Sequence, residues 1–285
     1  MLYLADSAGG HIRTVKTKLP ICDFSVSPDS AKLVFVPCHS TDYGGPLYLL
    51  DINAGVLQKL SVGPYWRVAS DAPVREVYAD PEFSPDNASV VFTVRKVPIN
   101  GHADLVEASG PLAIMQLGTR HVHLVQSTLN LDGNGPAFAN QPHWSPDGAT
   151  ILVSFETGFA VLPKTGTTIR MLEPDSLPND ADWSTAFGWV GNRCILFGAG
   201  HDGAVHDTEV LHLESRKAGP VSSLFGELLG GESGINSLHS SGSQLLVGTT
   251  NESKLLDTRS RQLLGHFPIG AKLVGTNKPA RQVCQ

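Results

Sequence analysis

Two histidines and two aspartates lie close together in the segment His201-Asp202-Gly203-Ala204-Val205-His206-Asp207. Imidazole and carboxylate groups can hold a metal ion or transfer protons. A metal site would need a third ligand from elsewhere in the chain, and His143 and Asp182 are the candidates. The same composition is typical of a solvated polar loop, which is the favoured interpretation. His143, His201 and His206 are therefore weak metal candidates only, and we expect no cofactor.

The usual sequence signatures of enzymes do not occur in this chain. There is no Gly-x-Ser-x-Gly elbow, no Walker-type loop and no dinucleotide-binding glycine motif. No carboxylate pair stands out as that of a glycosidase, although a pair drawn from two distant segments would be invisible in a sequence. We assign no catalytic residue and favour a protein that is not an enzyme.

Length and charge exclude several other classes. The chain has 285 residues and a formal net charge of −6. Non-specific nucleic-acid binding is disfavoured, because it requires clustered lysine and arginine side chains. No apolar run of about 18 residues occurs, so we expect no membrane span. The first residues lack the basic and apolar regions of a signal peptide, which indicates the cytoplasm.

Four cysteines are present, at Cys22, Cys38, Cys194 and Cys284, and no two of them form a Cys-x-x-Cys pair. Cys22 and Cys38 are almost equidistant from a turn at Asp29-Ser30. A cross-strand disulfide would be possible in an oxidising compartment. Two reduced cysteines in the core are the favoured interpretation.

A repeated hairpin must supply the elements that position any site. In Trp144-Ser145-Pro146-Asp147-Gly148 the proline presets φ, the aspartate can bond its own backbone and the glycine supplies a positive φ. An apolar, β-branched run follows, which is a hairpin signature. The pattern recurs at Val26-Ser27-Pro28-Asp29 and Phe83-Ser84-Pro85-Asp86, with degenerate copies at 187–197 and 238–247. Such repetition indicates a repeat architecture.

A second type of hairpin follows each copy, as in Leu47-Tyr48-Leu49-Leu50-Asp51 and the strand after it. Each pair of hairpins makes a four-stranded unit, and a closed ring of such units has no long open edge. We therefore predict an all-β, six-bladed β-propeller of four-stranded antiparallel blades. The N-terminal strands, 2–16, would complete the C-terminal blade. The predicted blades of this single domain, 1–285, are approximately 20–62, 78–126, 140–173, 184–226, 235–267, and 268–285 with 1–17.

The repeat unit resembles the WD-like repeat of TolB-type β-propellers. The three Ser-Pro-Asp triplets carry this resemblance, each preceded by Val26, Phe83 or Trp144. The resemblance covers nearly the whole chain as architecture. It implies a bacterial-type propeller, and a periplasmic or secreted location as the alternative to the cytoplasm. Propellers of this kind occur in periplasmic assembly proteins, as gating domains of serine peptidases and in some polysaccharide lyases.

Successive turns of an antiparallel blade lie on alternate faces of the propeller. The loops between the second and third strands therefore share one face with the connections between blades. These segments are long, at 62–80, 95–110, 127–142, 173–186, 198–208 and 226–236. Long loops on a rigid scaffold usually carry binding. The polar and aromatic residues there are Tyr65, Trp66, Arg67, Arg75, His102, Asp104, His143, Asp180, Asp182, Trp183, His201, Asp202, His206 and Asp207.

The sequence thus predicts a monomeric, non-catalytic propeller that binds a protein or peptide partner through the long-loop face. The residues predicted to bind are Trp66, Arg67, His143, Asp182, Trp183, His201, Asp202 and His206. The alternative is a metal-assisted polysaccharide lyase or hydrolase that uses histidine and aspartate at the mouth of the channel.

Overall fold

The regular elements of the described chain are β-strands. The computed structural model describes residues 2–4, 13–15, 17–38, 45–60, 74–98, 112–125, 140–155, 158–165, 170–172, 183–201, 204–220, 237–241, 244–248, 252–257 and 262–267. The chain forms two compact units: Met1–Tyr3, Thr14–Pro142 and Pro163–Ile169 make the first, and Leu4–Arg13, His143–Leu162 and Arg170–Gln285 make the second. Within the described residues, no helix is long and apolar enough to cross a membrane.

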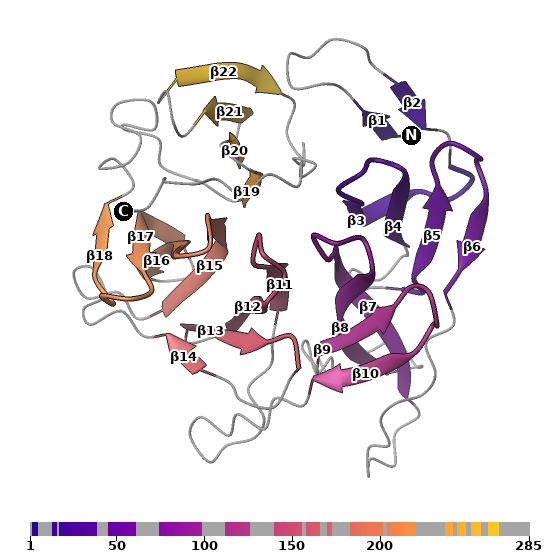
Figure 1. Ribbon diagram of the computed structural model, residues 1–285, viewed down its shortest axis with the longest axis horizontal. Coiled ribbons are helices and arrows are strands. Elements are labelled where there is room, and N and C mark those ends of the chain that lie inside the picture. The colour runs from indigo at the N-terminus through magenta and orange to yellow at the C-terminus, as the bar shows by residue number, and fades with distance from the viewer. Residues whose placement is uncertain are drawn as a thin grey trace. The chain divides into compact units, whose positions relative to one another are not determined.

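The first unit contains two four-stranded antiparallel sheets (Figure 1). One sheet has the order β3 (Ile21–Val26), β4 (Lys32–Pro37), β5 (Tyr48–Asp51) and β6 (Leu57–Lys59). The other has the order β7 (Val74–Phe83), β8 (Ser89–Pro98), β9 (Leu112–Gln116) and β10 (Val122–Val125). Spatial order therefore follows chain order, as expected for hairpins that follow one another.

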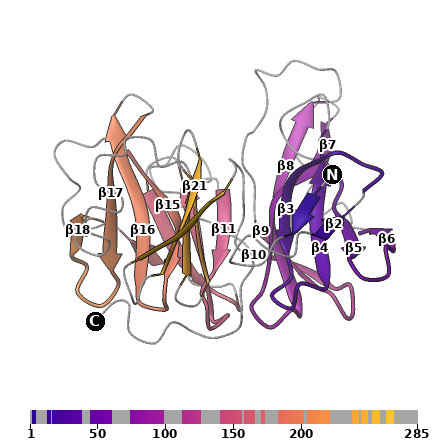
Figure 2. The ribbon, with the colours of Figure 1, turned by 90° about the horizontal axis from the view of Figure 1, so that it is seen from above.

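The other three four-stranded sheets lie wholly or mostly in the second unit. They are β11 (Asn140–Trp144), β12 (Thr150–Phe155), β13 (Gly158–Pro163) and β14 (Arg170–Leu172); β15 (Trp183–Val190), β16 (Cys194–His201), β17 (Ala204–His212) and β18 (Ala218–Pro220); and β19 (Ser237–Ser241), β20 (Gln244–Gly248), β21 (Ser253–Asp257) and β22 (Gln262–Phe267). Figure 2 shows the long strands of the β15–β18 sheet running side by side.

The number of blades differs from the prediction. The described residues form five four-stranded sheets, and the predicted sixth blade is not among them. Among the described strands, β1 (Leu2–Leu4) and β2 (Arg13–Val15) pair with each other in a separate two-stranded sheet. Residues 268–285, which were expected to complete that sheet, lie outside the described part. The count of six arose because the N-terminal hairpin repeats the sequence pattern of a half blade, and the blade count is corrected to five.

The three Ser-Pro-Asp turns share one hydrogen-bond pattern. Between β7 and β8, the Ser84 hydroxyl donates to Asp86 and accepts the Ser89 N–H at 2.9 Å, while Asp86 Oδ1 accepts the Ala88 N–H at 3.0 Å. The same bonds occur between Ser27 and Asp29 and between Ser145 and Asp147. All three serines are buried, so their hydroxyls need these partners. The triplet is therefore a structural unit.

Two of these aspartates have lowered pKa values. The pKa of Asp29 lies below its usual range, first because the Ser27 hydroxyl bonds the carboxylate and then because the Ala31 N–H does. At Asp86, burial acts in the opposite direction and would raise the pKa. The bonds from Ser84 and Ala88, together with the charge of Lys164, outweigh burial and lower it.

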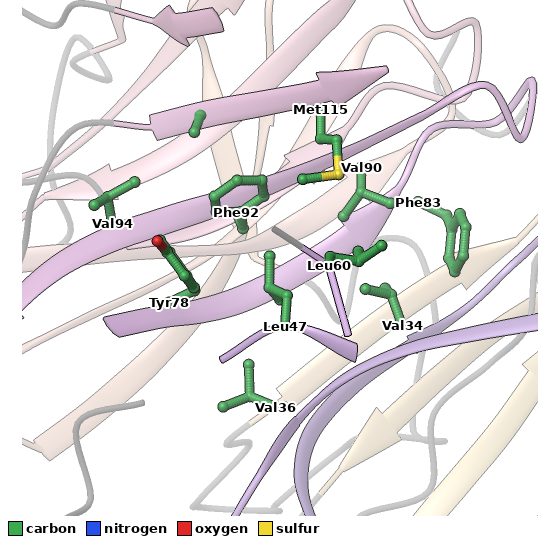
Figure 3. Packing of buried hydrophobic residues seen from close by; sticks show 11 residues of the cluster. Val34, Val36, Leu47, Leu60, Tyr78, Phe83, Val90, Phe92, Val94 and Met115 are labelled. Carbon is green, nitrogen blue, oxygen red and sulfur yellow. The ribbon is translucent and has the colours of Figure 1, made fainter. Parts of the chain in front are cut away.

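Neighbouring sheets bury their apolar faces against each other. In the first unit, one cluster draws Val34 and Leu47 from the first sheet and Tyr78, Phe92 and Met115 from the second (Figure 3). In the second unit, a corresponding cluster joins Leu152 and Phe159 to Trp189, Ile195 and Phe197. The core of each unit is therefore built between sheets, which requires the strands of one sheet to be fixed against the next.

Two cysteines are oxidised, and one of them differs from expectation. Cys38, directly after β4, and Cys194, the first residue of β16, are both disulfide-bonded. No free cysteine occurs among the described residues. The backbone of Cys22 belongs to β3, but its side chain lies outside the described part. The preference for reduced core cysteines is therefore wrong for Cys38.

Candidate functional site

Few of the residues predicted to bind can be placed completely. Trp66, Arg67, Asp182 and Asp202 lie outside the described residues. The backbones of Trp183, His201 and His206 belong to β15, β16 and β17, but their side chains lie outside the described part. Only His143 is described in full. The convergence of these residues on one face stays a prediction.

The predicted long loop at 198–208 is mostly a hairpin. Strands β16 and β17 remain paired from Cys194↔His212 as far as His201↔Ala204, with a register shift between Ala199 and Gly200. The prediction of a long loop there is therefore wrong. Gly198, Gly200 and Gly203 interrupt the apolar alternation, so the sequence pattern of a strand is lost there.

His143 lies on β11, and its backbone carbonyl accepts a hydrogen bond from Trp189 Nε1 at 2.9 Å. This bond links the β11–β14 sheet to the β15–β18 sheet. The His143 side chain is half-buried. Within the described ranges, no three His, Cys, Asp or Glu side chains are grouped so that they could hold a metal ion.

A charged network that the sequence did not reveal connects the two sheets of the first unit. Asp80 on β7 donates its backbone N–H to a carboxylate oxygen of Asp23 on β3. The Asp80 carboxylate, through Oδ2, accepts the Thr93 hydroxyl at 2.9 Å and Arg95 Nη2 at 2.8 Å. The Arg95 and Asp80 side chains are only 16% and 22% exposed, so the ion pair is partly shielded from water.

A bulge in β7 makes this network possible. The register with β8 shifts between Ala79 and Glu82, and Asp80 adopts a left-handed conformation with a φ of 51°. Aspartate is one of the few residues that tolerate this region. Bulges turn the backbone out of the regular ladder, and here the Asp80 N–H reaches the neighbouring sheet. Phe83 adds a second hydrogen bond between the two sheets, since its N–H donates to Ser25 Oγ at 3.2 Å.

Glu82 follows the bulge on the same strand and is half-buried. The hydrogen bonds hold Asp80 and Arg95 in fixed orientations, which suits recognition of a complementary group more than proton transfer.

A left-handed residue occupies the same repeat position in the β11–β14 sheet. Asp80-Pro81-Glu82-Phe83-Ser84-Pro85-Asp86 aligns without gaps with Gln141-Pro142-His143-Trp144-Ser145-Pro146-Asp147. Gln141, like Asp80, precedes a proline and is left-handed, with a φ of 47°. His143 therefore occupies the repeat position of Glu82. The shared proline was the available sequence signal for this position.

Comparison with known proteins shows the fold. No protein-family model matches the chain, and no curated protein sequence matches it either. Among solved structures, TolB from Acinetobacter baumannii matches with a TM-score of 0.60 and 16% identity, over 96% of this chain and 61% of that one. A putative TolB from Agrobacterium tumefaciens matches with a TM-score of 0.56 and 15% identity, over 94% of this chain and 88% of that one.

The same fold is found in a larger protein, a prolyl endopeptidase. It matches with a TM-score of 0.54 and 15% identity, over 98% of this chain but only 38% of its own. The chain also spans only 61% of the length of the Acinetobacter TolB chain. At these identities the likeness concerns architecture alone. The resemblance read from the Ser-Pro-Asp repeats is confirmed, and the chain has the β-propeller fold of TolB proteins.

Proposed function

We propose that this β-propeller is a non-catalytic module that binds a protein or peptide partner. The observation that carries the proposal is the partly exposed charged network of Asp23, Asp80 and Arg95 on the first two sheets. Its groups are held in place before any partner arrives. A pre-ordered charged surface contributes specificity and association rate to protein binding.

The contacts of Asp80 favour binding over catalysis. Its Oδ2 atom accepts bonds from both Thr93 and Arg95, and Asp23 accepts the Asp80 backbone N–H. These contacts fix the orientation of the Asp80 side chain, which suits a pre-ordered binding surface. Trp66 and Arg67, of residue types that dominate binding interfaces, extend the proposal to the segment between β6 and β7.

The test compares two variants that lose the same charge. Asp80→Asn removes the charge while keeping a residue that tolerates a left-handed backbone. Glu214→Gln is the matched control, because Glu214 is 75% exposed in the turn between β17 and β18. Partners recovered on the immobilised wild-type chain are purified, and their affinities for all three proteins are measured by calorimetry.

We expect Asp80→Asn to lower the affinity for the partner about tenfold or more. Glu214→Gln should leave that affinity unchanged. Circular dichroism checks that both variants are folded. Equal affinity for all three proteins would place the partner elsewhere on the chain. Turnover of a peptide or polysaccharide by the purified wild-type protein would contradict a non-catalytic role.

A further inference from the structure

Both cysteine side chains that the structure describes are oxidised. Cys38 and Cys194 are disulfide-bonded, and they belong to different sheets. Cys38 follows β4, and its backbone N–H donates to the Pro20 carbonyl at 3.0 Å beside the start of β3. Cys194 begins β16, where its Sγ lies 3.3 Å from Nδ1 of His212. We propose that these are permanent structural disulfides, and that the chain folds in an oxidising compartment.

The chemistry of the bond sets the requirement for that compartment. Each disulfide forms from two thiols, which together lose two protons and two electrons. The oxidant is a disulfide-carrying protein or small molecule, whose own disulfide is reduced to two thiols by exchange. In the cytosol, thiol reductants reverse this reaction, so structural disulfides are characteristic of periplasmic, secreted and extracellular proteins.

The two bonded cysteines differ in burial. With its bond in place Cys194 is 0% exposed, so a reductant can reach this sulfur only when the fold opens. Cys38 is half-buried. Exchange requires access to the sulfur, so the two bonds should differ in their sensitivity to reductant.

The first experiment traps the thiols of the full chain. The chain is exported to an oxidising compartment of the expression host, and a second preparation is folded in a reducing cytoplasm. Both are denatured without reductant in the presence of an alkylating reagent and digested with trypsin. In the exported protein, we expect the peptides 33–59 and 194–216, which contain Cys38 and Cys194, to be unalkylated and joined to other cysteine peptides.

A second measurement follows the order in which Cys38 and Cys194 are reduced. Native exported protein is treated with a mild phosphine, and we expect Cys38 to become alkylatable first and Cys194 only after urea is added. Protein folded in the reducing cytoplasm lacks these bonds, and its melting temperature should lie roughly 5 °C or more below that of the exported form.

Two results would overturn the proposal. One is quantitative alkylation of Cys38 and Cys194 in the exported protein. The other is a melting temperature of the exported protein no higher than that of protein folded in the reducing cytoplasm, because the bonds would then not stabilise the fold. Neither result bears on partner binding, which is tested separately at Asp80.

Discussion

One position in the turn between the third and fourth strands is left-handed in three sheets. Gly55, Arg120 and Arg216 have φ values of 67°, 61° and 56°. In each case the backbone N–H bonds the carbonyl four residues earlier, at Asp51, Gln116 and His212. Glycine adopts this conformation without steric cost, whereas arginine does not.

Replacing Gly55 isolates the cost of this conformation. Gly55→Ala places a methyl group in open space, with no atom within 4 Å, so only the left-handed backbone opposes it. We expect the free energy of unfolding to fall by about 1 kcal/mol in urea titrations. Gly118→Ala is the control, since it is equally uncrowded but lacks a positive φ. Equal effects of the two changes would show that conformation is not the cause.

His123 makes stability depend on pH. Partial burial, followed by the charge of His121, lowers the pKa of His123, while a bond to the Lys164 backbone partly opposes this. A lowered folded-state pKa gives stability that is present above the unfolded pKa and is lost as pH falls through the folded value. We expect the free energy of unfolding to decline between about pH 7 and pH 5.

His123→Gln should flatten that decline, and His121→Gln should raise the pKa of His123 in an NMR titration, because a neighbouring positive charge is removed. An unchanged pH dependence in His123→Gln would assign the effect to another group.

The Ser-Pro-Asp hairpins depend on their serine at the level of the element. Ser84→Ala leaves the buried Ser89 N–H without its hydroxyl acceptor and removes the bond to Asp86. We expect the free energy of unfolding to fall by about 1–3 kcal/mol in denaturant titrations. The pKa of Asp86 should rise, as followed by NMR. Ser27→Ala should repeat both effects at Asp29; a neutral outcome in either turn would refute the structural role of the serine.

These turns were predictable because their chemistry is local. Gly148 is left-handed as expected, with a φ of 68°, and Ser30 and Asn87 take the same conformation in the other two copies. The β16–β17 hairpin was less predictable, because Gly198 and Gly200 suppress the alternation that marks a strand. Local pattern identifies a turn better than it identifies a glycine-containing strand.

The candidate site was not predictable from spacing. Asp23, Asp80 and Arg95 lie on three different strands, and Asp23 and Asp80 meet only because a bulge turns the β7 backbone. No local periodicity encodes a contact between residues 57 positions apart. Of the residues that sequence reasoning did select, His143 alone is fully described, and its backbone contact with Trp189 is a structural one.

At the scale of the molecule, stability should depend on packing between sheets. Phe92 is 0% exposed and belongs to the cluster that includes Val34 and Leu47 of the β3–β6 sheet (Figure 3). Phe92→Ala should lower the free energy of unfolding by about 3–5 kcal/mol in guanidinium titrations. Leu57→Ala is the control, because Leu57 is 36% exposed at the outer strand β6. A small effect of Phe92→Ala would mean that this cluster collapses around the lost ring.

The propeller architecture was predictable from the sequence, including the pairing of each Ser-Pro-Asp hairpin with the hairpin after it. The blade count was not, because β1 and β2 carry the pattern of a half blade, yet within the described part of the chain they form a sheet of two strands. A pattern reports what a segment can pair with, and the structure reports which partner it has.

The Ser-Pro-Asp turn also bears on how such a chain can change. All the bonds from its serine and aspartate side chains to other groups of the turn join residues no more than five positions apart, as at Ser84, Asp86 and Ser89. The turn therefore carries its own bonds with it, while Asp86 also contacts Lys164 and the Asp147 N–H donates to Asn192. A short turn of this kind can be duplicated together with its strand pair and keep its local structure. Gene-level copying of hairpins offers a simple route by which descendants of one propeller could come to differ in blade number.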